Sequence, residues 1–381
     1  MGRNNAIYLG LAVTALVTLG LVMLTSTSVW DSDVDGYSLV WKQVRWIAAG
    51  LVAGFLVARM DYRKLRPYWV HGLVAICILL ALCYIPGIGQ EIKGEKRWVK
   101  IPALPQFQPS EMAKIITVLA LAAWYTHFQM ETRSFFKGFI LPGLLLGVPV
   151  MLIFWEKDMG TAMALSASGG VVMYIAGARL PYLLGTGIAG LAGMGVVVWK
   201  NPERMGRVMA LFDLEGEKYR LGDGYQQLHG LYALANGGVD GVGLGKGVEK
   251  LGYLPEAHTD FIFPAIGEEL GLWFTLGSVF AFVVIVIYGI AIAMNAKDHF
   301  GRLLAAGLTA IVVIPAMMNI GVCTAVLPNT GLPLPFISYG GTNMVFTLIA
   351  IGMLVSIHRQ TRFVSRQEMP VINEKKQCVR I

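Results

Sequence analysis

The chain has 381 residues, of which 55% are hydrophobic and only 14% are charged, and its mean hydropathy is +0.60. Because soluble domains carry about 25% charged residues, this composition excludes a soluble globular protein, a disordered chain and a soluble nucleic-acid-binding protein. The net charge of +7 is therefore expected to act at a lipid surface, and no nucleic-acid partner is predicted. Neither a CxxC spacing nor an HExxH sequence occurs, so no metal site is predicted.

Ten apolar stretches approach the roughly 20 residues that a helix needs to cross a bilayer. They cover residues 6–25, 44–58, 68–85, 112–128, 139–155, 161–178, 181–199, 270–294, 303–322 and 343–357. The sequence therefore predicts an all-α polytopic membrane protein with about ten transmembrane helices. One transmembrane domain is expected over residues 1–358, followed by a basic tail over 359–381. In an alternative with nine spans, residues 161–199 are partly re-entrant.

The distribution of charge indicates the orientation. Lysine and arginine are more frequent in the tail and in the connections on the side of the N-terminus, which predicts that both termini are cytoplasmic. Most aspartates and glutamates fall in the opposite connections. We therefore expect a multi-pass protein of the cytoplasmic (inner) membrane whose chemistry takes place on the extracytoplasmic side.

Polar residues precede the fourth and sixth predicted spans. Ser110 is expected to be a helix N-cap, and Glu111 and Lys114 are spaced to form an ion pair. Ionisable groups in a transmembrane helix are costly and by default functional, although a structural capping pair is the alternative. Asp158 is expected to be the N-cap of the sixth span.

The connection over residues 200–269 is too long to be a simple link. Asn201 followed by proline is typical of a helix start, and an apolar stripe ending at Phe212 predicts a helix in the membrane interface. This helix would present Arg204 and Arg207 together. The alternative is that these arginines only extend to lipid headgroups.

A second helix over residues 226–235 and a glycine-rich turn over 236–247 follow in the same connection. The turn matches neither the P-loop nor the GxGxxG spacing. Its backbone N–H groups could still bind an anion beside Lys246, and a tight packing turn is the equal alternative. Both readings place the turn outside the membrane.

His258, Thr259 and Asp260 stand directly before the aromatic residues Phe261 and Phe263. Partial desolvation there would raise the pKa of the Asp260 carboxyl and suit it to act as a general base. The alternative is a structural carboxylate paired with an arginine. Capping of the eighth predicted span suffices to explain the two glutamates at 268–269.

The segment over residues 323–342 is apolar enough to enter the membrane, but its prolines at 328, 333 and 335 exclude a continuous helix. Non-helical backbone at membrane depth survives only against protein or a water-filled cavity. The sequence therefore predicts a re-entrant segment that lines a cavity open to the outer side.

Several of these motifs recur in the same order in a known family. They are Phe107–Glu111 with Lys114, Asp158-x-Gly160-Thr161-Ala162, Gly224-Tyr225-Gln226, Gly241-x-Gly243-Leu244-Gly245, Leu254–Phe263 with Gly267-Glu268-Glu269-Leu270-Gly271, and the stretch from Pro328 to Gly341. The chain resembles the SEDS proteins (shape, elongation, division and sporulation), the family of FtsW, RodA and SpoVE, over essentially all ten spans. Residues 241–245 and 255–258 are more similar to the division branch, FtsW, than to the elongation branch, RodA. Lys157 departs from the family pattern, in which proline is usual at this position.

The resemblance implies a peptidoglycan glycosyltransferase that polymerises lipid II into glycan strands on the outer face of the inner membrane, for septal wall synthesis in cell division. It implies that Asp260 is the catalytic residue and that Glu111 and Lys114 are important for activity. It also implies, as partners, a single-span class B penicillin-binding transpeptidase and division-complex proteins. The alternatives are a lipid II flippase, an elongation-type polymerase and a scaffold without enzymatic activity.

An inverting displacement of this kind needs a base for the acceptor hydroxyl and cations for the departing diphosphate. We assign the base to Asp260. Cofactors are not evident, although a divalent cation could assist. The expected substrate-binding residues are Arg97, Gln108, Ser110, Glu111, Lys114, Asp158, Arg204, Arg207, Tyr225, Gln226, Lys246, His258, Thr259, Ser338, Tyr339 and Gly340.

Overall fold

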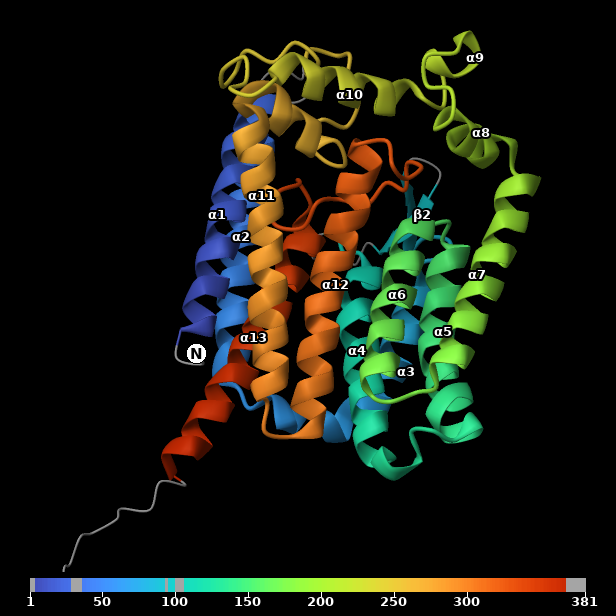
Figure 1. Ribbon diagram of the computed structural model, residues 1–381, viewed down its shortest axis with the longest axis vertical. Helices are drawn as coiled ribbons and strands as arrows, with labels where there is room; N and C mark the ends of the chain where they lie inside the picture. Colours follow the sequence, from blue (N-terminus) through green and yellow to red (C-terminus); the bar gives the residue numbers. More distant parts are fainter. Residues whose placement is uncertain (1–3, 29–35, 93–94, 100–105, 368–381) are drawn as a thin grey trace, which may run out of the picture.

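The computed structural model describes residues 4–28, 36–92, 95–99 and 106–367 (Figure 1). The last part of the predicted basic tail, residues 368–381, lies outside the described residues. The ten longer helices are α1 (Asn5–Ser28), α2 (Gly36–Arg59), α3 (Trp69–Leu82), α4 (Pro109–His127), α5 (Leu141–Trp155), α6 (Met159–Ile175), α7 (Leu180–Lys200), α11 (Ile262–Asn295), α12 (His299–Cys323) and α13 (Gly341–Gln367) within these ranges.

Shorter elements connect these helices. The 3₁₀-helix η1 (Tyr62–Tyr68) and the π-helix η3 (Phe136–Ile140) lead into α3 and α5, and the short 3₁₀-helix η2 (Gln129–Glu131) follows α4. An antiparallel pair, β1 (Gly89–Ile92) and β2 (Glu95–Val99), precedes α4. The long connection after α7 contains α8 (Pro202–Ala210), α9 (Glu217–Arg220) and α10 (Tyr225–Gly237).

Each of the ten predicted apolar stretches falls on one of the longer helices. In the described part of the chain, eight helical stretches are long and apolar enough to cross a membrane. The two others are α6, which has only 17 residues, and α4, which carries the charged Glu111 and Lys114. Residues 161–199, which the nine-span alternative made partly re-entrant, form the separate helices α6 and α7.

The core of the bundle surrounds α12, which is mostly buried and packs against α4, α6, α11 and α13. By contrast, no residue of α7 is buried, and this helix stands at the edge of the bundle (Figure 1). A helix with little intramolecular packing exposes its apolar side chains to lipid, which suits the apolar composition of α7.

The non-helical segment over residues 324–340 connects α12 to α13 and lies inside the bundle (Figure 1). Its backbone approaches α1 at Gly20, where a Cβ atom would lie only 2.6 Å from the carbonyl oxygen of Ile337. Gly20 lies eight residues before the end of α1 at Ser28, so the segment reaches well below that end. Glycine is required at this position because any side chain would collide with the segment.

Candidate active site

Asp260 lies in a turn before α11 that hydrogen bonds hold against the non-helical segment. The backbone oxygens of residues 258, 259 and 260 accept hydrogen bonds from Tyr339 N, Ser338 Oγ and Asn319 Nδ2, at 3.0, 2.6 and 2.7 Å respectively. Two of these donors belong to the segment and the third to α12. The fold therefore fixes the backbone of the predicted catalytic residue from two elements that are distant in the sequence.

The carboxylate of Asp260 faces the non-helical segment. A Cβ atom placed on Gly331, which has a φ of +66°, would lie 3.6 Å from Asp260 Oδ2. Phe261 and Phe263 are buried and anchor the turn, whereas Asp260 is only partly buried. The carboxylate thus borders an apolar core without being sealed inside it.

Other predicted site residues lie in or beside the same turn. Thr259 Oγ1 donates to Glu256 Oε2 at 2.8 Å, and the φ of Glu256 is +57°. The rings of His258 and Tyr339 are 6.2 Å apart. Gly340 N donates to Gln43 Oε1 of α2 at 3.3 Å. The structure therefore brings His258, Thr259, Ser338 and Tyr339 together around Asp260.

The helix α10 is hydrogen-bonded to the non-helical segment. It is predicted over residues 226–235 and extends over 225–237. Asn329 Nδ2 donates to Gln226 Oε1 at 2.6 Å. The buried Gln227 donates to the backbone oxygens of Val322 and Leu327, at 2.9 and 2.8 Å. Sequence reasoning selected Gln226 and missed Gln227, because only burial distinguishes the two amides. Tyr225 packs against the ring of His229 on the same helix.

Asp158, Arg97 and Gln108 form a second cluster. Asp158 is the N-cap of α6, as predicted, because its Oδ1 accepts from Thr161 N at 2.9 Å. Its other oxygen lies 3.7 Å from Arg97 Nη1 and 3.4 Å from Gln108 Nε2. Three of the expected binding residues thus converge at the start of α4 and α6.

The predicted N-cap role of Ser110 is wrong. The helix α4 begins at Pro109, and Gln108 occupies the N-cap position without a side-chain capping bond. Proline fits the first helical position because its φ is already helical and its missing N–H would have had no partner there. Ser110 is instead fully buried, and its hydroxyl has no hydrogen-bond partner among the described residues.

Sequence reasoning missed Glu156, which lies between α5 and α6. Only 1% of Glu156 is exposed, and its carboxylate oxygens have no hydrogen-bond partner in the described part of the chain. Burial and the negative charge of Asp158 raise the pKa of Glu156 to about 8. The sequence feature that could have pointed to a buried acid is the position of Glu156 directly after an apolar run. The next residue, Lys157, has a φ of +68°, which the proline usual in the family cannot adopt.

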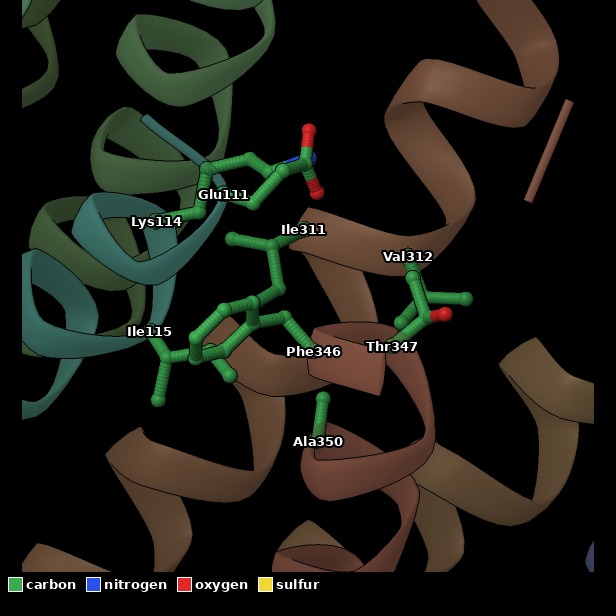
Figure 2. Close-up of a pocket in the computed structure, with 8 residues that line it drawn as sticks. All are labelled: Glu111, Lys114, Ile115, Ile311, Val312, Phe346, Thr347 and Ala350. Carbon is green, nitrogen blue, oxygen red and sulfur yellow. The ribbon is translucent and has the colours of Figure 1, made fainter. Parts of the chain in front are cut away.

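Glu111 and Lys114 form the predicted ion pair, with Lys114 Nζ 2.9 Å from Glu111 Oε2. Figure 2 shows this pair at a small cavity whose other lining residues come from α4, α12 and α13. The cavity volume of about 10 Å³ leaves room for about one water molecule. Both side chains are about 95% buried. A phosphate contact by Lys114 would therefore require this cavity to widen.

The helix α8 begins as predicted, with Asn201 accepting a hydrogen bond from Arg204 N and proline at the first position. It packs on α7 and α9 at the edge of the molecule (Figure 1). Arg207 forms an exposed ion pair with Glu203, at 2.7 Å. Arg204 and Arg207 are only partly buried at this edge, and the side chain of Arg207 stays 41% exposed within its ion pair.

The glycine-rich turn does bind anions, but they belong to the chain itself. Gly245 N donates to Glu269 Oε2 at 2.9 Å, and Val248 N donates to Glu268 Oε1 at 2.9 Å. Lys250 Nζ lies 2.6 Å from Glu269 Oε1 in a fully buried ion pair. Lys246 is exposed on this turn. The turn is therefore a structural clamp around two carboxylates.

The expectation that Glu268 and Glu269 cap the eighth span is wrong. The helix α11 already begins at Ile262 and continues through a kink at Gly271, where φ is +77°. Both glutamates lie inside this helix and bind the turn described above. Tertiary contacts, and not the N–H groups at the start of a helix, satisfy these two carboxylates, which lie just before the non-helical Gly271.

Comparison with known proteins places the chain in a family. A family model described as "Cell cycle protein", that of FtsW, RodA and SpoVE, matches residues 7–363. The chain belongs to the FtsW/RodA/SpoVE family. The probable peptidoglycan glycosyltransferase FtsW of Geobacter metallireducens is 36% identical over 358 residues, which cover 93% of this chain and 94% of that protein. Stage V sporulation protein E of Bacillus subtilis is 34% identical, covering 91% and 95% respectively.

Two solved structures have a similar fold over most of the chain. A chain from the study "Structural coordination of polymerization and crosslinking by a peptidoglycan synthase complex" gives a TM-score of 0.77 at 29% identity, covering 93% of this chain and 97% of that chain. The rod shape determining protein RodA of Thermus thermophilus gives a TM-score of 0.68 at 26% identity, covering 93% and 96%. The protein is thus an all-α polytopic membrane protein of this family.

Proposed function

We propose that this protein is a peptidoglycan glycosyltransferase that polymerises lipid II on the outer face of the cytoplasmic membrane. Its membership of the FtsW/RodA/SpoVE family and the names of its relatives support the reaction. The prevalence of FtsW among these relatives favours septal synthesis during cell division. The observation that carries the proposal is the partly exposed Asp260, whose turn is hydrogen-bonded to α12 and to the non-helical segment that its carboxylate faces.

In the proposed reaction, a sugar hydroxyl of one lipid-linked saccharide attacks the anomeric carbon of another. The new carbon–oxygen bond forms as the bond to the diphosphate breaks, so the configuration inverts. Asp260 takes the hydroxyl proton as general base. Positive groups neutralise the departing diphosphate, and arginine suits this role because its planar group binds two phosphate oxygens at once.

Arg97, Arg204 and Arg207 are the proposed diphosphate ligands, because none of the three is completely buried. Arg97 is 24% exposed beside Asp158, and its ion pair there is long, at 3.7 Å. Arg204 and Arg207 extend from α8. Lys114 remains a candidate only if its buried pair with Glu111 opens, because in this conformation the pair neutralises both charges.

The orientation and partners belong to the same proposal. The charge distribution supports cytoplasmic termini and an extracytoplasmic site. A related chain comes from a complex that couples polymerisation to crosslinking. We therefore propose a single-span class B penicillin-binding transpeptidase as the partner of this protein, together with division-complex proteins.

The test is polymerisation of labelled lipid II by the purified protein, with and without a candidate transpeptidase. Asp260→Asn should fold and insert but lose at least about 100-fold in rate, because a general base contributes roughly 10²–10⁴-fold. Asp240→Asn, an exposed acid of the same connection, is the matched control and should keep the wild-type rate. Normal turnover by Asp260→Asn would refute the base assignment. Absence of polymer from the wild-type complex would favour a flippase.

A further inference from the structure

Asn319 is a buried amide that connects the turn of Asp260 to the non-helical segment. It lies on α12, one turn before the end of the helix, and only 1% of it is exposed. Its single amide nitrogen donates to the backbone oxygen of Asp260 and to that of Leu332, both at 2.7 Å. Because a primary amide carries two N–H bonds, both hydrogen bonds can form at once.

These two acceptors belong to the two sides of the candidate active site. Leu332 follows Gly331, which borders the Asp260 carboxylate at 3.6 Å from its virtual Cβ atom to Oδ2. The amide therefore sets the separation between the acid and the segment that faces it. A second bridge runs through Ser338, which donates to Thr259 O at 2.6 Å and accepts from Leu334 N at 2.7 Å.

We propose that Asn319 is a positioning residue that holds Asp260 at a fixed distance from the segment over residues 328–335. The inference rests on the proposed function, because it concerns the base of that reaction. Neither serine nor threonine has two donors, and an ionised aspartate of the same shape has none. In either case at least one of the two carbonyls loses its amide donor, while Asp260 O also accepts from Cys323 Sγ at 3.5 Å.

The chief variant is Asn319→Asp, which keeps the shape of the side chain and removes its amide donors. We expect kcat for lipid II polymerisation to fall by about 10- to 100-fold, because a displacement of about 1 Å at a reacting group costs up to about 100-fold. KM should stay within about twofold, since only 1% of Asn319 is exposed and its side chain is not available for direct contact with a ligand. The acid limb of the pH–rate profile should shift upward, because a second carboxylate near Asp260 disfavours its ionisation.

Two further variants separate positioning from general structure. Asn319→Ser keeps one donor, so its kcat should lie between those of Asn319→Asp and the wild type, with an unshifted acid limb. Thr324→Val is the matched control near the same helix end, because among the described residues the Thr324 hydroxyl donates only to carbonyls of α12, at 2.8 and 3.4 Å. This control should keep the wild-type kcat, KM and pH profile. Elution as a single detergent-solubilised species checks the fold of each variant.

The outcomes distinguish this inference from the function on which it rests. If Asp260→Asn is inactive while both Asn319 variants keep the wild-type kcat and pH profile, the positioning role is wrong and the base assignment stands. If Asp260→Asn is active, the base assignment itself fails. A merely structural role would lower kcat and raise KM by similar factors. It would also lower the unfolding temperature and leave the acid limb of the pH–rate profile unshifted. If Asn319→Asp does not fold, Asn319→Ser provides the test. A reduced kcat supports the positioning role, and a wild-type kcat contradicts it.

Discussion

Two acidic residues illustrate how position within the bundle sets chemical behaviour. Asp260 borders an apolar core but stays partly exposed, which suits an acid that exchanges a proton with substrate. Glu156 is almost completely buried beside Asp158, Arg97 and the thiol of Cys83, with Tyr84 also close, and its pKa is raised to about 8. It is therefore mostly protonated at neutral pH.

The raised pKa of Glu156 predicts a pH dependence of stability. The ordinary value is 4.5, so between pH 4.5 and about 8 the folded state holds a proton that the unfolded state releases. The contribution of Glu156 to stability is therefore greatest below pH 4.5 and falls as the pH rises through this window, by about 1.4 kcal/mol per unit of pKa difference at most. Glu156→Gln should unfold at a higher temperature than the wild type at pH 8 and at a similar temperature at pH 4.5.

Thermal unfolding of the detergent-solubilised protein across this pH range measures the difference. Glu203→Gln is the control, because Glu203 is 67% exposed and its removal should not change the pH dependence. Parallel curves for Glu156→Gln and the wild type would contradict the raised pKa.

At the scale of elements, α8 decides whether the long connection takes part in substrate binding. This helix has an apolar stripe and two arginines. Its main helix contacts are with α7 and α9. Such a helix can rest on lipid headgroups or hold a lipid-linked diphosphate. Contact with lipid headgroups needs only the positive charge of the guanidinium group, whereas binding of a diphosphate uses its paired N–H groups.

Arg207→Lys distinguishes these roles, because it keeps the charge and removes the paired geometry. If Arg207 binds diphosphate, kcat/KM for lipid II should fall by about 10-fold, the value of roughly one charge-assisted hydrogen bond. Arg220→Lys on the exposed surface of α9 is the matched control and should leave kcat/KM unchanged. An unchanged kcat/KM for Arg207→Lys would indicate that Arg207 only contacts lipid headgroups.

At the scale of the whole molecule, the Glu111–Lys114 pair lies where α4, α12 and α13 meet. Removing one partner of a buried ion pair leaves an uncompensated charge and costs about 3–5 kcal/mol, whereas removing both is often nearly neutral. We expect Lys114→Met to lower the unfolding temperature markedly. The double variant Glu111→Gln with Lys114→Met should recover most of that loss.

The exposed pair Lys137–Glu131 provides the comparison, with an N–O distance of 2.7 Å and both side chains more than 40% exposed. Its neutralisation should cost less than about 1 kcal/mol. Thermal unfolding of these variants and of the wild type in one detergent measures both costs. A single Lys114→Met variant as stable as the wild type would show that the core tolerates the unpaired carboxylate.

The sequence by itself determined the features that depend on local spacing. Apolar runs of sufficient length predicted the helices, and short-range patterns predicted the caps at Asp158 and Asn201 and the pair of Glu111 with Lys114. These predictions succeed because helix geometry fixes which residues three or four positions apart meet. Motif order predicted the family, which the comparisons confirm.

Only the tertiary structure decided which distant residues meet. Sequence spacing does not relate Asn319 to the Asp260 turn, or Glu268 and Glu269 to the glycine-rich turn and the residue after it. Spacing also does not predict that Glu156 is buried. Such contacts form because buried carbonyls, N–H groups and carboxylates need partners wherever packing places them. One chain read alone shows which groups need partners, but packing determines which partners they find.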